Sequence, residues 1–401
     1  AASDVYKRQL TNYENTLTLG STSRSSVYVR IIKVIYMKTI KLYDEMPYST
    51  DFKATVVEVN KNEIILDQTL FFPEEGGQEC DLGTINDIPV KDVQIKNDVI
   101  IHYVKKHHFD VGDTIEGHID WKRRYSFMQN HTGEHLLSGI VHSLYGYDNV
   151  SFHLNSEEGQ VEYDGDIKDI DLIEEKVNQA IYENKEINCF YPDDLESISY
   201  RSKKEIEGKV RIVEIKDYDI CACCAPHVKR TGELGVFKII KVIHTTRGTR
   251  FIFLFGERAY HRFKDDFDHL ESLYHLFSSN NQTLVKQVNK MYEEKTALEV
   301  KYAQLEKEHM ISLCDHAYLF VEDCLPINQR EVTNHLVHVY STGGVFVGND
   351  EKGYRYVIGS ANNALDILTQ LKSLKSKGGG SKDMIQGFTP ASKTELLKAL
   401  S

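Results

Sequence analysis

The stretch "NHTGEHLLSG" places two histidines, His131 and His135, four residues apart and next to a pair of leucines. Four residues are about one turn of an α-helix, so both imidazoles would lie on one helical face. Two imidazoles on one face can bind a single metal ion. The same spacing also occurs on ordinary amphipathic helices, so this pair alone does not predict a metal site.

A second pair of potential ligands lies further along the chain in "CCAPH", where Cys223 and His227 also stand four residues apart. Two histidines on a helix and a Cys/His pair on a loop form a donor set that suits zinc. We therefore predict one Zn²⁺ per chain, bound by His131, His135, Cys223 and His227. Cys224 could replace Cys223 as the sulfur ligand, and the sequence does not decide between them.

The composition limits the classes of protein to consider. The chain has 401 residues, is 41% hydrophobic and 27% charged, and carries a net charge of −12. These values are typical of a folded protein with two or three domains. The acidic charge argues against nucleic-acid binding by whole-molecule charge, although a local basic track remains compatible with it. Seven cysteines in a chain of this length favour reduced thiols and a cytoplasmic location over a disulfide framework.

The pattern of apolar residues predicts an α+β fold. Short β-rich runs precede the first ligand motif, and no apolar run is long enough to span a membrane, so we expect no membrane partner. "DWKRRYSFMQNHTGEHLLSGIVHSLYG" predicts an amphipathic helix that ends at Gly146. The predicted regions are a non-native or disordered leader (1–36), a small β-barrel-like domain (37–117), a zinc-containing α+β domain (118–257), a helical or coiled-coil arm (258–312) and a C-terminal α/β domain (313–401).

The predicted arm contains a heptad seam. Its apolar positions step by four and three residues, with one lysine inserted: Leu284, Val288, Met291, Lys295, Leu298, Tyr302 and Leu305. Such a seam favours pairing with another helix, so a homodimer through the arm is one expectation. A surface helix packed on its own domain is the other.

The two ligand motifs and the upstream stretch "FFPEEGGQECDLGTI" together carry a family resemblance. From about Lys41 to Arg258 the chain resembles the editing domain of alanyl-tRNA synthetase and its free-standing relatives, the AlaX proteins. Downstream, "GGVFVG" and "KGGGSKDMIQGF" resemble the C-terminal domain of that synthetase. The combination resembles the long AlaX type. Two stretches depart from the family pattern, because Glu75 replaces a glycine of the turn and "CCAPH" replaces Cys-Gly-Gly-Thr-His.

The resemblance implies a zinc-dependent aminoacyl-tRNA deacylase, a carboxylic ester hydrolase. Its implied substrate is tRNA(Ala) that carries the wrong amino acid, which is serine or, as a second candidate, glycine. It also implies catalytic roles for Thr69 and Gln78, in serine recognition or in placing a water. Gly76, Gly77 and Arg124 are expected to contact the substrate. By the same resemblance, the tRNA-binding residues of the C-terminal domain are Lys375, Lys377, Gly379 and Lys382.

Several alternatives stay open at this point. Four protein ligands normally close a zinc site, so an RNA-binding protein with a purely structural zinc fits the same residues. The editing domain of threonyl-tRNA synthetase shares the two-histidine motif, although it lacks this C-terminal domain. A DHH phosphoesterase would need an Asp-His-His segment, which we do not find. Glu134 stands directly before the second histidine, which is the wrong place for a metalloprotease base, so we expect a solvated helical residue.

Overall fold

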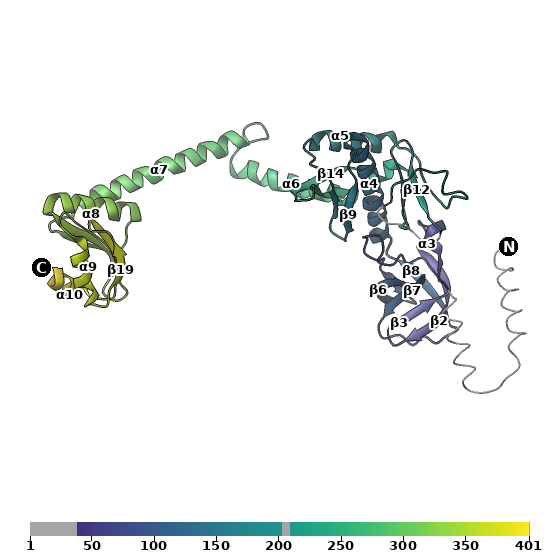
Figure 1. Ribbon diagram of the computed structural model, residues 1–401, viewed down its shortest axis with the longest axis horizontal. Coiled ribbons are helices and arrows are strands. Elements are labelled where there is room, and N and C mark those ends of the chain that lie inside the picture. Colours follow the sequence, from purple (N-terminus) through teal and green to yellow (C-terminus); the bar gives the residue numbers. More distant parts are fainter. Residues whose placement is uncertain (1–37, 203–208, 401) are drawn as a thin grey trace, which may run out of the picture. The chain divides into compact units, whose positions relative to one another are not determined.

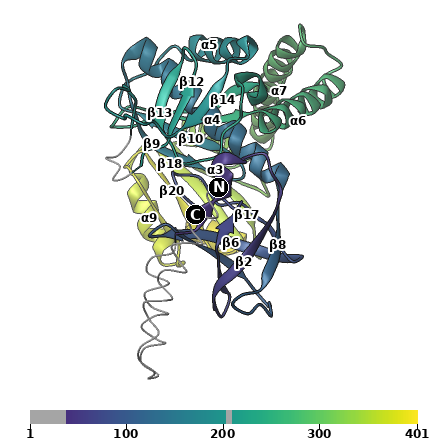
Figure 2. The same ribbon diagram turned by 90° about the vertical axis from the view of Figure 1, so that its right-hand side faces the viewer.

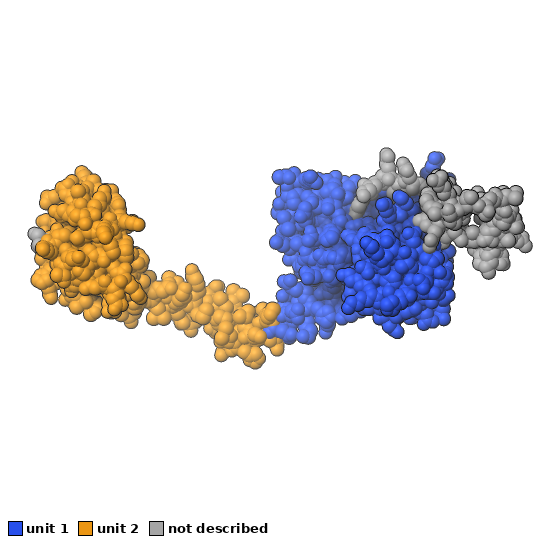
Figure 3. Space-filling view, turned by 90° about the horizontal axis from the view of Figure 1, so that it is seen from below, with its two compact units in different colours: residues 1–268 blue, residues 269–401 orange. Residues whose placement is uncertain are grey.

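The computed structural model describes residues 38–202 and 209–400 (Figure 1). The predicted leader, residues 1–36, lies outside these ranges. The chain divides into two compact units, residues 1–268 and residues 269–401, which are coloured separately in Figure 3. Several sheets and helices make up the units, so the α+β class is confirmed. Among the described helices, none combines the length and apolarity that a membrane span requires.

The first unit begins with a closed barrel in the strand order β2-β3-β7-β6-β5-β8. Buried and more exposed residues alternate along β7 and β8, because successive side chains of a strand point to opposite faces. The inward residues form one apolar core, as the alternating sequence pattern predicted. The strands are β2 (Asp51–Asn60), β3 (Glu63–Leu66), β5 (Gly83–Ile85), β6 (Ile88–Lys96), β7 (Val99–Val104) and β8 (Thr114–Ile119). Three short elements accompany them: β1 (Ile40–Lys41), its parallel partner β4 (Gln68–Thr69), and α3 (Leu42–Glu45).

The rest of this unit is built around one helix, α4 (Trp121–Tyr145). Asp120 caps its first turn by accepting a hydrogen bond from the backbone N–H of Arg123, and Gly146 ends it in the left-handed conformation. Every residue from 127 to 141 is buried. The middle of the helix is therefore enclosed on all sides, and the prediction of an amphipathic helix was wrong for that stretch.

Two antiparallel sheets pack against α4 (Figure 2). One has the order β14-β15-β10-β9 and the other the order β11-β12-β13. Glycines allow the close approach: a Cβ on Gly133 would lie 2.5 Å from the ring of Phe255 in the first sheet. The elements are β9 (Asn149–Leu154), β10 (Gly159–Tyr163), α5 (Ile170–Glu183), β11 (Ile187–Phe190), β12 (Ile212–Ile215), β13 (Asp219–Ala222), the 3₁₀ helix η1 (Thr231–Leu234), β14 (Phe237–His244) and β15 (Thr249–Phe255).

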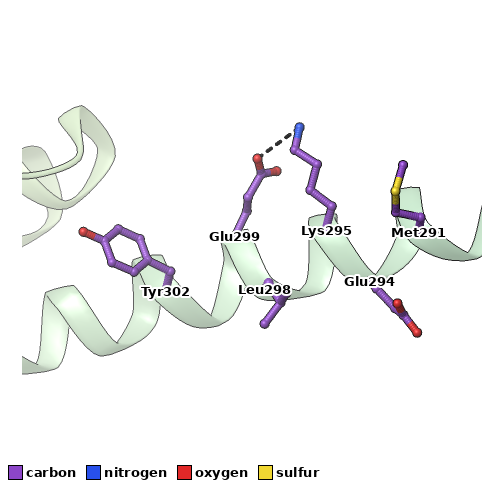
Figure 4. Close-up of a pocket in the computed structure, with 6 residues that line it drawn as sticks. All are labelled: Met291, Glu294, Lys295, Leu298, Glu299 and Tyr302. Atoms are coloured by element: carbon purple, nitrogen blue, oxygen red, sulfur yellow. Dashed lines mark ion pairs between the residues drawn. The ribbon is translucent and has the colours of Figure 1, made fainter. Parts of the chain in front are cut away.

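The predicted arm consists of two helices, α6 (Glu257–Leu276), which crosses the boundary between the units, and α7 (Leu284–Ser312) in the second unit. Figure 4 shows the middle of α7, where Met291, Leu298 and Tyr302 border a shallow groove. Leu298 is 66% exposed and Tyr302 is 59% exposed. Most of the predicted heptad seam is therefore solvent-accessible in a single chain.

The second unit also contains a five-stranded sheet in the order β16-β17-β18-β20-β19. Only the β16–β17 pair is parallel among these strands, and α8 makes the crossover between them. Two small apolar cores lie against the sheet. The elements are β16 (Tyr318–Val321), α8 (Pro326–Tyr340), β17 (Thr342–Asn349), β18 (Gly353–Ser360), α9 (Ala364–Lys372), β19 (Lys377–Gly380), β20 (Met384–Thr389) and α10 (Lys393–Leu400).

Candidate metal centre

The structure brings the four predicted ligands together. His131 and His135 project from α4, and Cys223 and His227 come from the loop that follows β13. One donor atom of each residue lies within 4.8 Å of the others. Cys223 Sγ is 3.5 Å from His131 Nε2 and 3.3 Å from His227 Nε2. Tetrahedral zinc with ordinary Zn–S and Zn–N bonds would separate such atoms by about 3.5 Å, so the spacing fits a single zinc ion.

Of the two cysteines that the sequence left open as the sulfur ligand, Cys223 is the one whose Sγ lies among the imidazoles. Cys224 instead lies near the glycine turn, where a Cβ on Gly76 would be 3.8 Å from its Sγ. Burial and the charge of the neighbouring Cys223 raise the pKa of the Cys224 thiol, which keeps it protonated. All seven cysteines lie in the described ranges and none forms a disulfide, as expected for reduced thiols.

Each histidine has a polar group near its Nδ1 atom. In His131 and His227 a hydrogen bond at Nδ1 leaves Nε2 as the ligand atom. His131 Nδ1 is 2.8 Å from Gln78 Oε1, and His227 Nδ1 is 2.9 Å from Thr132 Oγ1. The third partner is acidic, since Asp219 Oδ2 lies 3.4 Å from the Nδ1 of His135. Metal-bound histidines usually donate their other ring N–H in this way, which fixes the tautomer and the orientation of the ring.

The protonation states of His227 and Cys223 suit a metal ion. For His135, burial lowers the pKa, but the neighbouring Cys221, Cys223 and Asp219 outweigh it and raise the pKa above its usual range. Burial lowers the pKa of His227 to about 3, so its imidazole is neutral at pH 7. Burial by itself would raise the pKa of the Cys223 thiol. Neighbouring imidazoles, His131 first among them, outweigh that effect and lower this pKa well below its usual range, which favours the thiolate. Neutral imidazole and thiolate are the forms that bind zinc.

The turn that contains Gly76, Gly77 and Gln78 lies beside this group. Gly76 and Gly77 have φ values of +63° and +84°, which disfavour any side chain. A Cβ on Gly77 would lie 2.6 Å from the carbonyl oxygen of Phe152 in β9, and one on Gly76 would lie 4.0 Å from His131. The family resemblance predicts that these three residues lie near the substrate. The structure adds that Gln78 is a direct partner of His131.

The structure places Thr69 on β4, outside the barrel strands but in contact with β7. It is fully buried, and its Oγ1 lies 2.9 Å from His102 Nε2 and accepts a hydrogen bond from the backbone N–H of Phe71. Burial lowers the pKa of His102 to about 4, so the ring is neutral and carries one N–H. Its Nδ1 is near the carbonyl oxygen of Ile64, so Nε2 accepts the Thr69 hydroxyl proton. These contacts engage the Thr69 hydroxyl inside the first unit.

Arg124 is also engaged in packing. Its side chain is fully buried at the start of α4 and donates to both carboxylate oxygens of Asp81. The same guanidinium donates to the carbonyl oxygens of Leu70 and Pro47. These partners belong to the barrel and its connections, whereas Arg124 belongs to α4. Arg124 and Asp81 thus form a buried ion pair that connects α4 to the barrel part of the first unit.

The four residues proposed for tRNA binding lie in the second unit, apart from the metal ligands in sequence. Lys375, Lys377, Gly379 and Lys382 are all exposed, on β19 and in the turns on either side of it.

Sequence reasoning missed most of the polar residues behind the ligands. Glu134, which we expected on a solvated face, is only 2% exposed and accepts hydrogen bonds from Ser138 and Asn149. Thr132 stands between the two ligand histidines. That position in the sequence was the only sign that its hydroxyl could contact a ligand. Nothing in "KDYDIC" distinguishes Asp219 from the neighbouring Asp217.

Comparisons with known proteins match two parts of this chain to domains of tRNA synthetases. A model described as "tRNA synthetases class II (A)" matches residues 6–123. A second, described as "Threonyl and Alanyl tRNA synthetase second additional domain", matches residues 210–252. The second range includes both ligands of the Cys/His loop.

Curated relatives are similar to this chain over about two thirds of its length. The alanyl-tRNA editing protein AlaX-L of Pyrococcus horikoshii is 30% identical over 287 residues, which are 67% of this chain and 70% of that protein. The alanyl-tRNA editing protein Aarsd1-B of Xenopus laevis is 30% identical over 65% of this chain and 63% of its own length. The alanine–tRNA ligase of Ignicoccus hospitalis is 32% identical over 64% of this chain, which corresponds to 30% of the ligase. With the buried three-histidine, one-cysteine group in place, these matches show that the chain belongs to the alanyl-tRNA editing protein family.

Proposed function

We propose that this chain hydrolyses the ester bond of Ser-tRNA(Ala), with Gly-tRNA(Ala) as a second candidate substrate, at a zinc ion bound by His131, His135, Cys223 and His227. The observation that carries this proposal is the cluster of three imidazoles around the Cys223 thiolate, in which His131 and His227 hydrogen-bond through Nδ1 and turn Nε2 toward the sulfur. Family membership supports a tRNA substrate.

Bound zinc would polarise the ester carbonyl and lower the pKa of a water molecule. The protein residues would supply the positioning. Gln78 and Thr132 hold two imidazoles in a fixed tautomer, and the turn at Gly76 and Gly77 allows the aminoacyl group to approach closely. Because four protein ligands normally close a zinc site, the substrate would enter as a fifth ligand or displace one of the four.

We further propose that the second unit contacts the tRNA backbone. Lys375, Lys377 and Lys382 are exposed around β19, and the exposed Gly379 leaves room for a phosphate to approach the strand. Lysine–phosphate contacts add affinity without reading sequence.

The test measures hydrolysis of Ser-tRNA(Ala) beside Ala-tRNA(Ala), with and without a chelator. His131→Ala should abolish the hydrolysis of the serine ester. The matched control is His142→Ala, because His142 lies on the same helix but is exposed and pairs with Asp148 at the surface. The deacylase would be established if only Ser-tRNA(Ala) is hydrolysed. That hydrolysis must be abolished by chelation and by His131→Ala but not by His142→Ala. No hydrolysis of either ester, despite bound zinc and intact tRNA binding, would instead support an RNA-binding protein with a structural zinc.

A further inference from the structure

The three Nδ1 partners at the metal centre differ in charge. Gln78 offers a neutral amide oxygen and Thr132 a hydroxyl, whereas the partner of His135 is the carboxylate of Asp219. The side chains of His135 and Asp219 are 5% and 2% exposed. Their 3.4 Å contact lacks the angle of a hydrogen bond, so His135 Nδ1 is a buried polar atom without a formed bond. A buried ring nitrogen in that state calls for an explanation.

Asp219 is itself held firmly from the other side. Arg201 Nε donates to its Oδ1 at 2.8 Å and Nη2 donates to its Oδ2 at 2.9 Å, a two-point grip on one carboxylate. The backbone of Arg201 also pairs with β13, since its N–H donates to Ile220 O at 2.8 Å and its carbonyl accepts from Ala222 N–H at 3.0 Å. The position of Asp219 is therefore set by its own strand and by the neighbouring backbone.

A chain of polar contacts leads from this pair back to the helix that carries His135. Arg201 Nη1 donates to Asn149 Oδ1 at 3.3 Å, and the Asn149 amide donates to Glu134. Glu134 directly precedes His135 on α4. The contacts thus form a closed circuit from α4 through β9 and β13 to the imidazole. Such a circuit resists a shift of the ring relative to the carboxylate.

We propose that Asp219, held by Arg201, is the positioning residue for His135: it accepts the Nδ1 proton and so presents Nε2 to the metal ion. The inference rests on the zinc site of the proposed function. A carboxylate partner makes an imidazole a better electron donor than a neutral partner does, so Asp219 contributes to metal affinity rather than to contact with substrate. A small rotation of either side chain would turn the 3.4 Å contact into a hydrogen bond.

A second metal ion is the competing explanation, because His135, Asp219 and Cys221 also bring one donor atom each within 4.8 Å of the others. Arg201 argues against it. Its guanidinium occupies both carboxylate oxygens of Asp219 and puts a positive charge where a cation would have to approach. We therefore assign the three residues to support of one ion.

The experiment compares Asp219→Asn with Glu162→Gln in the full chain. Glu162 is the matched control, since it is a buried carboxylate paired with Arg250 at 2.7 Å in the four-stranded sheet. Zn²⁺ affinity is measured by competition with a chromophoric chelator, and the Co²⁺-substituted proteins are compared by their visible absorption. Asp219→Asn should weaken zinc binding by about 10–100-fold and change the cobalt spectrum, while Glu162→Gln leaves both unchanged.

Equal zinc affinities and cobalt spectra for the two variants would overturn the inference. If Asp219→Asn does not fold, Arg201→Lys serves instead, because it keeps the charge and loses the two-point grip. It should weaken zinc binding in the same direction, and an unchanged affinity would again overturn the inference. The outcomes separate the two proposals: a wild-type chain that fails to deacylate but needs Asp219 for zinc would refute only the proposed function.

Discussion

At the scale of single residues, Arg124 joins α4 to the barrel by a fully buried ion pair with Asp81. Arg124→Met would leave the Asp81 charge buried and unpaired, which we expect to cost about 3–5 kcal/mol of unfolding free energy in urea titrations. Removing an exposed arginine, Arg262, should change that energy by less than about 1 kcal/mol, because its pairing with Asp266 is solvated.

The same variant also tests the substrate contact that the family resemblance implies for Arg124. A folded Arg124→Met protein with wild-type stability and a raised KM for Ser-tRNA(Ala) would restore that role. Lower stability with an unchanged KM in the folded fraction would confine Arg124 to packing.

His102 should make the barrel sensitive to acid. Burial lowers its pKa to about 4 in the folded chain, against about 6.5 when it is exposed. Between these pH values the unfolded chain binds more protons, so the free energy of unfolding decreases as the pH falls from about 6.5 to 4. The shift corresponds to about 3 kcal/mol. His102→Gln cannot titrate, so its unfolding free energy should fall by that much less over the same range, and parallel curves for the two proteins would contradict the assignment.

The ligands were predictable and their partners were not, for a physical reason. A helical turn or a short loop sets the distance between the two members of each ligand pair, so spacing in the sequence reveals them. Gln78 and His131 are 53 residues apart, and Thr132 and His227 are 95 apart. Only the tertiary fold brings such pairs together, and contacts between residues so far apart cannot be read from a single sequence.

At the scale of elements, the contact between α4 and β13 depends on Gly139. A Cβ there would lie 2.5 Å from the carbonyl oxygen of Tyr218 and 2.8 Å from Asp219 Cβ. Gly139→Ala gains about 1 kcal/mol of helix propensity, yet the clash is with a backbone atom that cannot rotate away. We expect a net loss of stability and weaker zinc binding, because β13 must move away from His135.

Ser143→Ala is the control for this change, since Ser143 is an exposed position of the same helix. It should keep wild-type zinc affinity and thermal stability. A Gly139→Ala protein that matches it in both measurements would show that β13 yields without disturbing the metal centre.

The sequence predicted the barrel and the end of α4 but not the burial of that helix. Alternation revealed the strands, and Gly146 marked the C-terminus. Glu134 was expected to be solvated. It is hydrogen-bonded inside the protein instead, and so are two neighbouring polar residues of α4: Gln129 donates to Glu233 O at 2.7 Å, and Asn130 accepts from the backbone N–H of Phe255 at 2.9 Å. Polar residues that bond inside the protein look the same in a sequence as those that face water.

At the scale of the whole molecule, we propose that α7 pairs with α7 of a second copy. The heptad seam is mostly apolar, so the seams of two copies can pack against each other. Such a partner would cover Leu298 and Tyr302. Leu298→Glu should convert a dimer to a monomer in light-scattering measurements after gel filtration. Val300→Glu is the matched control, because Val300 is 67% exposed on the same helix but lies off the seam. A monomeric wild-type protein at high micromolar concentration would contradict the pairing.

The two ligand pairs lie far apart along the chain, and this separation has a consequence for folding stability. An ion bonded to His135 and Cys223 would tie the chain into a loop of about 90 residues, and a cross-link of that span restricts the unfolded chain by an amount worth about 4–5 kcal/mol. Unlike a disulfide, this tie survives among reduced thiols and can be undone by chelation. The ion would then act as a reversible cross-link, and the zinc concentration would affect the stability of the folded first unit.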